Sequence, residues 1–177
     1  MISIQVPKVF VRQTPMYVPR PRYIIIHNAN CLLEYNDPKT TIDTKKQQYQ
    51  WTKYIHVNQL KLSDINYHFI VDKLNNDYEI FVGKPLHSYC IFEDIDDMYL
   101  ESIHIAVMGD YNEDMANKRL YDVLAYRLIN PLLYWFHLDK NKVKLHSEVS
   151  KEEINCPGEF FFKEVLMSSI TRYTPAR

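Results

Sequence analysis

The feature that most constrains the fold is the run Tyr23-Ile24-Ile25-Ile26, in which three β-branched residues follow one another. A strand that is apolar on both faces must be covered on both faces, which is typical of a central strand in an α/β sheet. The run ends at His27, so an imidazole follows the strand directly. Because α/β proteins commonly carry functional groups at the carboxyl ends of their strands, His27 is a candidate site residue.

Later segments alternate between strand and helix patterns. Further strands are predicted at residues 67–71, 78–82, 102–108 and 142–145, with Asn75-Asn76-Asp77 as a turn. Helices are predicted from Asp43 or Thr44 to about Val57, from a cap at Asn117 to about Phe136, and over 159–171. This order predicts a single α/β domain with a central mixed β-sheet flanked by helices.

The helix after Asn117 has a clear apolar face, formed by four leucines at helical spacing: Leu120, Leu124, Leu128 and Leu132. Pro131 falls inside the same segment. Proline lacks a backbone donor and crowds the preceding turn, so we expect a kink there or a break into two helices.

The N-terminal region has a different character from the rest. Residues 1–22 include four prolines, at positions 7, 15, 19 and 21, which excludes a helix or a central strand. We expect an extended arm that lies on the domain or on a partner, with 9–11 as an edge strand. Residues 23–177 would then form the domain itself.

Composition excludes several classes of protein. The 177 residues carry a net charge of −1, which gives no sign of a nucleic-acid binder. There is no apolar run long enough to span a membrane, and the N-terminus lacks the pattern of a secretory signal. The three cysteines, an odd number, argue against a disulfide framework. Only three glycines are present, so we expect each to lie where a side chain would clash.

Two predicted strands end in histidine, at His27 and His146, and Cys156 follows in the loop after the second. Two imidazoles and a thiolate are three protein ligands, and a catalytic zinc site has three such ligands with a fourth position open to water. Pro157-Gly158 suits a turn that directs the thiolate. On these residues alone, the alternative is that each histidine satisfies a local hydrogen bond and Cys156 is a buried thiol.

Five short segments in order resemble one family. They are Ile24-Ile25-Ile26-His27-Asn28, Ile65-Asn66-Tyr67-His68-Phe69-Ile70-Val71, Gly83-Lys84-Pro85-Leu86-His87, Ser102-Ile103-His104-Ile105-Ala106, and His146-Ser147-Glu148-Val149 with Cys156-Pro157-Gly158. Over roughly residues 22–165 they resemble the type-2 N-acetylmuramoyl-L-alanine amidase and peptidoglycan-recognition family, and in motif most of all the phage amidase lysozymes.

The resemblance implies a function and a set of roles. His27, His146 and Cys156 would bind Zn²⁺, and Tyr67 would assist catalysis by donating a hydrogen bond to the developing oxyanion. His87 would contact substrate at the rim of the cleft, although a plain surface histidine is the alternative. The reaction would be hydrolysis of the amide between N-acetylmuramic acid and L-alanine, with peptidoglycan as the partner.

Likeness to phage amidases also implies a location. The protein would be made in the host bacterial cytoplasm and either released at lysis or built into the virion, where residues 1–22 could dock on other phage subunits. Neither nucleic acid nor a membrane is expected as a partner.

Two positions depart from the family pattern. Ile154 stands where active members usually carry Lys or Thr, and His104 replaces the glycine of the S-I-G strand. These departures imply an alternative function, namely a catalytically impaired module that binds peptidoglycan or serves as a structural component of a phage particle. From their strand positions, His68 and His104 are expected to be structural. The acidic stretch is expected to be a solvated loop; its members are Asp94, Asp96, Asp97 and Glu101.

Overall fold

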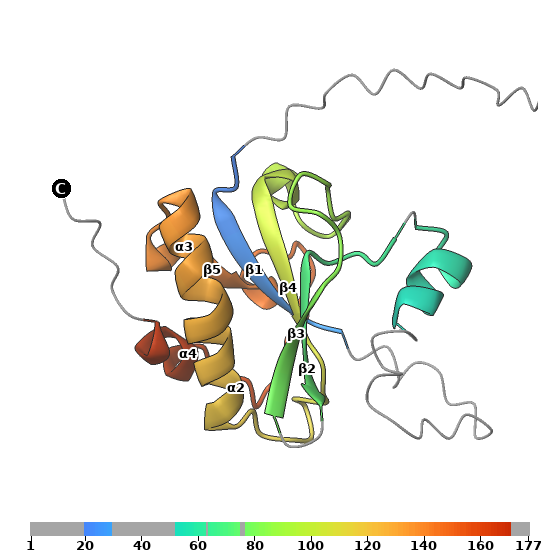
Figure 1. Cartoon of the computed structure of the whole chain (residues 1–177). Helices are drawn as coiled ribbons and strands as arrows, with labels where there is room; N and C mark the ends of the chain where they lie inside the picture. The colour runs from blue at the N-terminus through green and yellow to red at the C-terminus, as the bar shows by residue number, and fades with distance from the viewer. Residues whose placement is uncertain (1–19, 30–51, 63, 75–76, 171–177) are drawn as a thin grey trace, which may run out of the picture.

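A five-stranded mixed sheet organises the molecule, in the order β3-β2-β4-β1-β5 (Figure 1). The structure is a computed structural model that describes residues 20–29, 52–62, 64–74 and 77–170. The strands are β1 (Tyr23–Asn28), β2 (Phe69–Leu74), β3 (Asp77–Val82), β4 (Ser102–Val107) and β5 (Val143–Leu145). β1 runs parallel to both β4 and β5, and β2 runs parallel to β4 and antiparallel to β3. The predicted mixed α/β sheet is confirmed.

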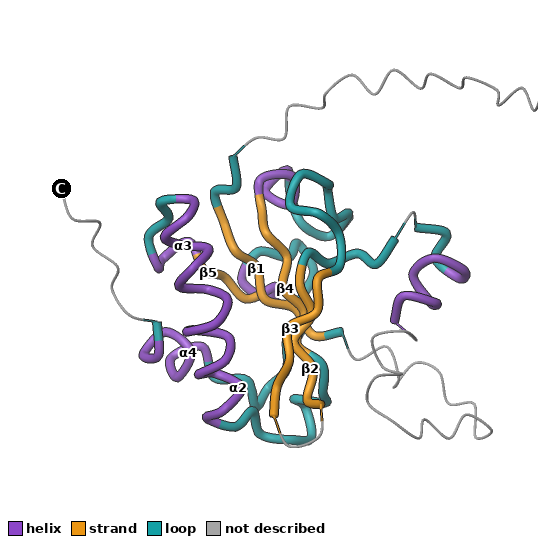
Figure 2. Tube along the Cα trace, in the orientation of Figure 1, coloured by secondary structure: helices purple, strands orange, loops and turns teal. Residues whose placement is uncertain are grey.

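One long helical segment covers a face of this sheet (Figure 2). It consists of α2 (Lys118–Asp122), the π-helical η3 (Val123–Ile129) and α3 (Asn130–Phe136). Asn117 caps it as predicted, since its side-chain oxygen accepts a hydrogen bond of 3.0 Å from the Leu120 N–H. The four leucines of the predicted apolar face are all buried. The C-terminal helix α4 (Lys163–Ser169) lies beside this segment.

The helix does not break at Pro131. Helical residues continue without interruption from Lys118 to Phe136, and the disturbance takes the form of the π-helical turns of η3. Pro131 offers no N–H to the preceding turn, and its ring crowds that turn. The wider π-helical turns accommodate both effects, so the disturbance predicted as a kink or a break takes the form of a local widening.

The other helical pieces are short. They are η1 (Ile55–Gln59), η2 (Asp97–Glu101), η4 (Lys140–Lys142) and η5 (His146–Glu148). No helix in the described ranges is long and apolar enough to cross a bilayer.

Alternate residues of each strand pack on opposite faces of the sheet, and the two faces have different covers. On one face Ile24, Ile26 and their neighbours on β4 form the main core with α2, η3, α3 and α4. On the other face Ala106 and Ile70 form a smaller cluster with Tyr67 and Phe92, which come from the segments around β2 and before β4. His27 and His104 belong to this second face, so the candidate site lies opposite the long helix.

Some predictions fall outside the described residues: the arm at 1–19 with its edge strand at 9–11, the start of the helix predicted from 43 or 44, Cys31, and the turn at 75–76. Of the arm, the described residues contact the domain, because the Arg20 guanidinium donates to the Phe136 carbonyl at 2.7 Å and the Arg22 N–H donates to Glu101 at 2.7 Å. Cys90 and Cys156 are free thiols.

All three glycines occupy crowded positions, as predicted. A Cβ on Gly83 would lie 2.2 Å from the Tyr67 carbonyl oxygen. Gly158 has φ of +137°, and a Cβ there would lie 2.6 Å from the backbone of Tyr111. Gly158 therefore allows the loop that carries Cys156 to approach the body of the domain.

Candidate metal centre

The two strand-end histidines lie side by side because their strands are paired. β1 and β5 are parallel neighbours, with Ile26 opposite Leu145, so the next residue of each chain segment emerges at the same edge. The ring centroids of His27 and His146 are 4.4 Å apart. Parallel pairing thus brings together two imidazoles that are more than a hundred positions apart in sequence.

Backbone hydrogen bonds hold the third candidate, Cys156, against this edge. The Asn28 N–H donates to Cys156 Sγ at 3.2 Å, and the Ser147 N–H donates to the Cys156 carbonyl at 3.0 Å. The Asn28 side chain also donates to the Pro157 carbonyl at 2.8 Å. The loop is therefore fastened both to the end of β1 and to the residue that follows His146.

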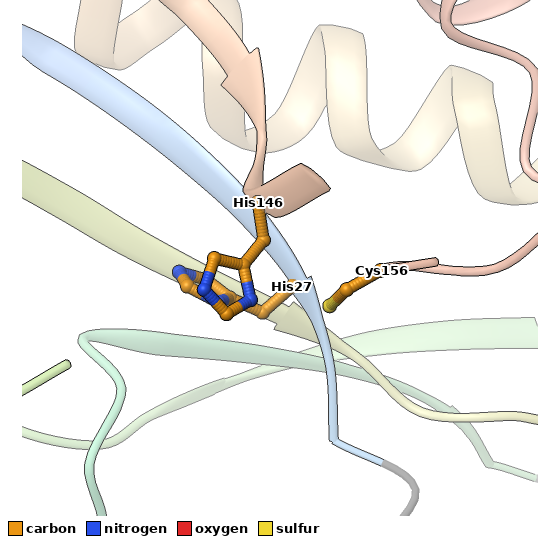
Figure 3. A group of neighbouring side chains, drawn as sticks. All are labelled: His27, His146 and Cys156. Atoms are coloured by element: carbon orange, nitrogen blue, oxygen red, sulfur yellow. The ribbon is translucent and has the colours of Figure 1, made fainter. Parts of the chain in front are cut away.

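The three side chains converge from three different segments, as Figure 3 shows. One donor atom from each of His27, His146 and Cys156 lies within 4.8 Å of the other two. A tetrahedral zinc site holds such nitrogen and sulfur atoms roughly 3.5 Å apart, given bonds of about 2.0–2.3 Å. With separations of at most 4.8 Å, the three atoms exceed that spacing by no more than about 1.3 Å. Donor type and spacing both fit zinc.

Burial sets the protonation of these groups. Burial lowers the pKa of His27 well below 6.5, and the neighbouring His104 and His146 act in the same direction. Burial also lowers the pKa of His146, against the opposing effect of Asp94. Both rings are therefore neutral at pH 7, the form that offers a lone pair to a metal.

The thiol behaves differently. Burial raises the pKa of Cys156 to about 11, although the Asn28 N–H on its sulfur acts in the opposite direction. In the metal-free protein the group is a thiol at neutral pH. A bound cation would favour the thiolate, so metal binding there releases a proton.

Three further residues surround the histidine pair, and the sequence analysis assigned none of them to the site. Phe92 stacks on His27, with centroids 4.3 Å apart and planes 17° from parallel. His104 Nδ1 lies 2.9 Å from His27 Nε2. The Asp94 carboxylate lies 2.7 Å from His146 Nε2, although the oxygen is off the N–H direction.

The expectation for the acidic stretch is therefore wrong at its first member. Asp94 is only partly exposed, and it also accepts a 2.9 Å hydrogen bond from the Ser150 hydroxyl. The isolated bridge between Ile95 and Ser150 holds it there. No local sequence pattern signals this bridge. His104 lies on the same face of β4 as Ala106. That position indicates a contact with His27 only once the register between β1 and β4 is known.

The two remaining candidates have different surroundings. Tyr67 is buried, and its ring centroid lies 5.5 Å from that of His27, so the structure brings it to the histidine pair. His87 is exposed after β3, and no hydrogen bond or ring contact within the described residues joins it to the three proposed ligands. Ile154 is half-buried, two positions before Cys156.

Solved structures with a similar fold are known, whereas no protein-family profile and no curated protein sequence matches the chain. N-acetylmuramoyl-L-alanine amidase LysC from Clostridium intestinale URNW superposes with a TM-score of 0.60 at 22% identity, covering 84% of each chain. Drosophila peptidoglycan recognition protein SD gives a TM-score of 0.61 at 21% identity, over 85% of this chain and 82% of that one. The chain has the amidase fold.

A phage protein shares it as well. The Ph2119 endolysin from Thermus scotoductus MAT2119 bacteriophage Ph2119 gives a TM-score of 0.59 at 20% identity, over 85% of this chain and 86% of that one. The predicted fold relationship to type-2 amidases and peptidoglycan recognition proteins is thereby confirmed. In this amidase-fold chain, the converging His27, His146 and Cys156 are the natural candidates for the functional site.

Proposed function

We propose that this chain is a zinc-dependent N-acetylmuramoyl-L-alanine amidase that acts on peptidoglycan. The observation that carries the proposal is the convergence of His27, His146 and Cys156 within 4.8 Å at the carboxyl edge of the sheet. Two imidazoles and a thiolate leave one position of a tetrahedral ion open, as hydrolytic zinc sites require. The amidase fold supports the choice of substrate, since LysC is an N-acetylmuramoyl-L-alanine amidase and Ph2119 is an endolysin.

Each residue has a distinct task in this proposal. His27, His146 and Cys156 would hold the ion, and bound zinc would activate water and polarise the carbonyl of the scissile amide. Tyr67, whose ring lies 5.5 Å from that of His27, would donate its phenol proton to negative charge developing on the carbonyl oxygen. Phe92 covers one side of His27 and limits the access of bulk water to that ring.

Zinc content and cleavage test the proposal together. Purified protein should contain about one zinc per chain by elemental analysis, and His146→Ala and Cys156→Ala should each lose it. The zinc-loaded protein should release peptide from muropeptides, whereas both variants should not. A folded protein that takes up no zinc, or a zinc-loaded protein that leaves muropeptides intact beside an active amidase, would refute the enzymatic function.

Ile154 supports a second candidate function, a catalytically impaired amidase-fold module that binds peptidoglycan or forms part of a phage particle, with residues 1–22 as the docking segment. The Ile154 side chain offers neither charge nor a hydrogen bond near the site, and the loss of one transition-state donor costs about 10²–10³ in rate. Ile154→Lys separates the two candidates. A gain in cleavage would mark position 154 as a lost catalytic site, while full wild-type activity that Lys does not improve would favour the intact enzyme.

A further inference from the structure

His104, on the neighbouring strand β4, lies beside His27 on the same face of the sheet. β1 and β4 are parallel, with Ile25 opposite His104 and His27 opposite Ala106, so the two histidines are diagonal neighbours on one face. Their side chains meet at 2.9 Å, from His27 Nε2 to His104 Nδ1. Both rings are buried, with 1% of His27 and 0% of His104 exposed.

The other nitrogen of His104 decides where the protons are. His104 Nε2 lies 3.1 Å from the carbonyl oxygen of Tyr99, and a carbonyl can only accept, so Nε2 carries the hydrogen. A neutral imidazole has one such hydrogen, which makes His104 Nδ1 an acceptor. His27 Nε2 must then be the donor in the contact between the rings.

The same reasoning fixes the free nitrogen of His27. With its proton on Nε2, the lone pair of the neutral ring is on Nδ1, and only a bare nitrogen can bind a metal. We propose that His104 is a positioning residue, which holds His27 in the tautomer whose Nδ1 is the metal ligand. The inference rests on the proposed function only in taking the bound group to be zinc.

Neighbouring rings and hydrogen bonds restrain His104. Its backbone N–H donates to His68 Nδ1 at 3.0 Å, and His68 Nε2 contacts the Ser88 carbonyl at 2.9 Å, so the neighbouring ring is fixed as well. Phe92 stacks on His104 at 4.6 Å with planes 25° apart, as it does on His27. One aromatic ring thus packs against both histidines.

The side chain at position 104 therefore provides the hydrogen-bond acceptor for His27. A glycine there would provide no acceptor for His27 Nε2, and both tautomers of His27 would be available. The His27 ring would then be held in neither this tautomer nor this orientation, and the acceptor that raises the basicity of Nδ1 would be lost. Partners of this kind typically change metal affinity by about 10–100-fold.

Two substitutions at position 104 test the role. His104→Leu removes the acceptor while filling the space, and His104→Asn keeps an acceptor oxygen close to the position of Nδ1. His68→Asn is the matched control, because His68 is also buried, in the adjacent segment, but within the described residues no hydrogen bond or ring contact joins it to His27.

The first readout is the tautomer itself, measured by ¹⁵N NMR of histidine-labelled, zinc-free, full-length protein at neutral pH. His27 should carry its proton on Nε2 in the wild type, in His104→Asn and in His68→Asn, and should populate both tautomers in His104→Leu. A wild-type His27 protonated on Nδ1 would overturn the proposal. This measurement also stands if His104→Leu does not fold, or if the protein turns out to bind no zinc.

The second readout is the zinc dissociation constant, measured by competition with a chromogenic chelator. His104→Leu should weaken binding by about 10–100-fold, while His104→Asn and His68→Asn should stay within about threefold of the wild type. Zinc bound by His104→Leu as tightly as by the wild type would refute the positioning role. Failure of every variant and of the wild type to bind zinc would instead refute the proposed function, and the NMR result would still decide the tautomer.

Discussion

The stability of this protein should fall as the pH drops below about 6.5, and His68 provides the sharpest test. The His68 side chain is 2% exposed, its Nδ1 accepts the His104 N–H and its Nε2 faces the Ser88 carbonyl. Burial, assisted by the buried ammonium of Lys84, lowers the pKa of His68 from 6.5 to about 4. Protonation of Nδ1 would also place two donors opposite each other, which the folded state cannot accommodate.

The size of the effect follows from these two pKa values. The folded-state pKa is depressed, so the unfolded chain binds the proton first and the stability is lost as the pH falls from about 6.5 towards 4. A pH of 5 is about 1.5 units below the pKa of the unfolded side chain. Each unit corresponds to about 1.4 kcal/mol. His68 alone should therefore remove about 2 kcal/mol from the free energy of unfolding between pH 7.5 and pH 5.

Urea unfolding of zinc-free protein at the two pH values measures this loss. His68→Asn keeps an acceptor for the His104 N–H but cannot titrate, so its free energy of unfolding should fall by about 2 kcal/mol less than that of the wild type over the same interval. His87→Asn, which removes an exposed histidine, should show the wild-type dependence. An identical pH dependence in the wild type and His68→Asn would refute the reasoning, and so would a wild type that gains stability at pH 5.

Three further substitutions have expected outcomes. Gly158→Ala should destabilise the fold by about 3 kcal/mol or more and weaken zinc binding, because its Cβ would lie 2.6 Å from the Tyr111 backbone and its φ is +137°; urea unfolding and chelator competition would measure both. Asp94→Asn should leave the fold intact but weaken zinc binding about 10–100-fold through His146, as measured by the same competition. Leu124→Ala should cost about 2–5 kcal/mol in urea unfolding, because the side chain is fully buried, with unchanged zinc affinity in the folded protein.

The parts of the fold that follow from local pattern were predictable from the sequence. Ile24, Ile25 and Ile26 are each 0% exposed in a strand between two parallel neighbours, as an unbroken β-branched run indicates. The position of His27 at the end of that strand follows from the same pattern. Leucine spacing likewise predicted the buried face of the long helix, because a helix of period 3.6 places those residues on one side.

The surroundings of the site were beyond prediction because they depend on register and on loop closure. His104 was expected to be a structural residue, yet it contacts His27 across the β1–β4 pairing, and no local feature specifies that register. Asp94 reaches His146 through the bridge between Ile95 and Ser150, two segments without periodic pattern. The π-helical turns before Pro131 show the same limit, because the proline signals a disturbance but not the form that it takes.

The two departures from the family pattern act on different steps, which makes them separable. Position 104 is in the buried layer behind His27, so changes there act on the tautomer and thus on metal affinity. Position 154 is half-exposed, in the loop that leads to Cys156. Within the described residues, no hydrogen bond joins it to His27 or His146. Ile154→Lys should therefore alter cleavage without altering zinc affinity. If the zinc dissociation constant changed as much in Ile154→Lys as in His104→Leu, the result would show that the loop at position 154 and the strand at position 104 do not act separately on zinc binding. Unchanged affinity with a changed rate would place the catalytic question at position 154 and the binding question at position 104.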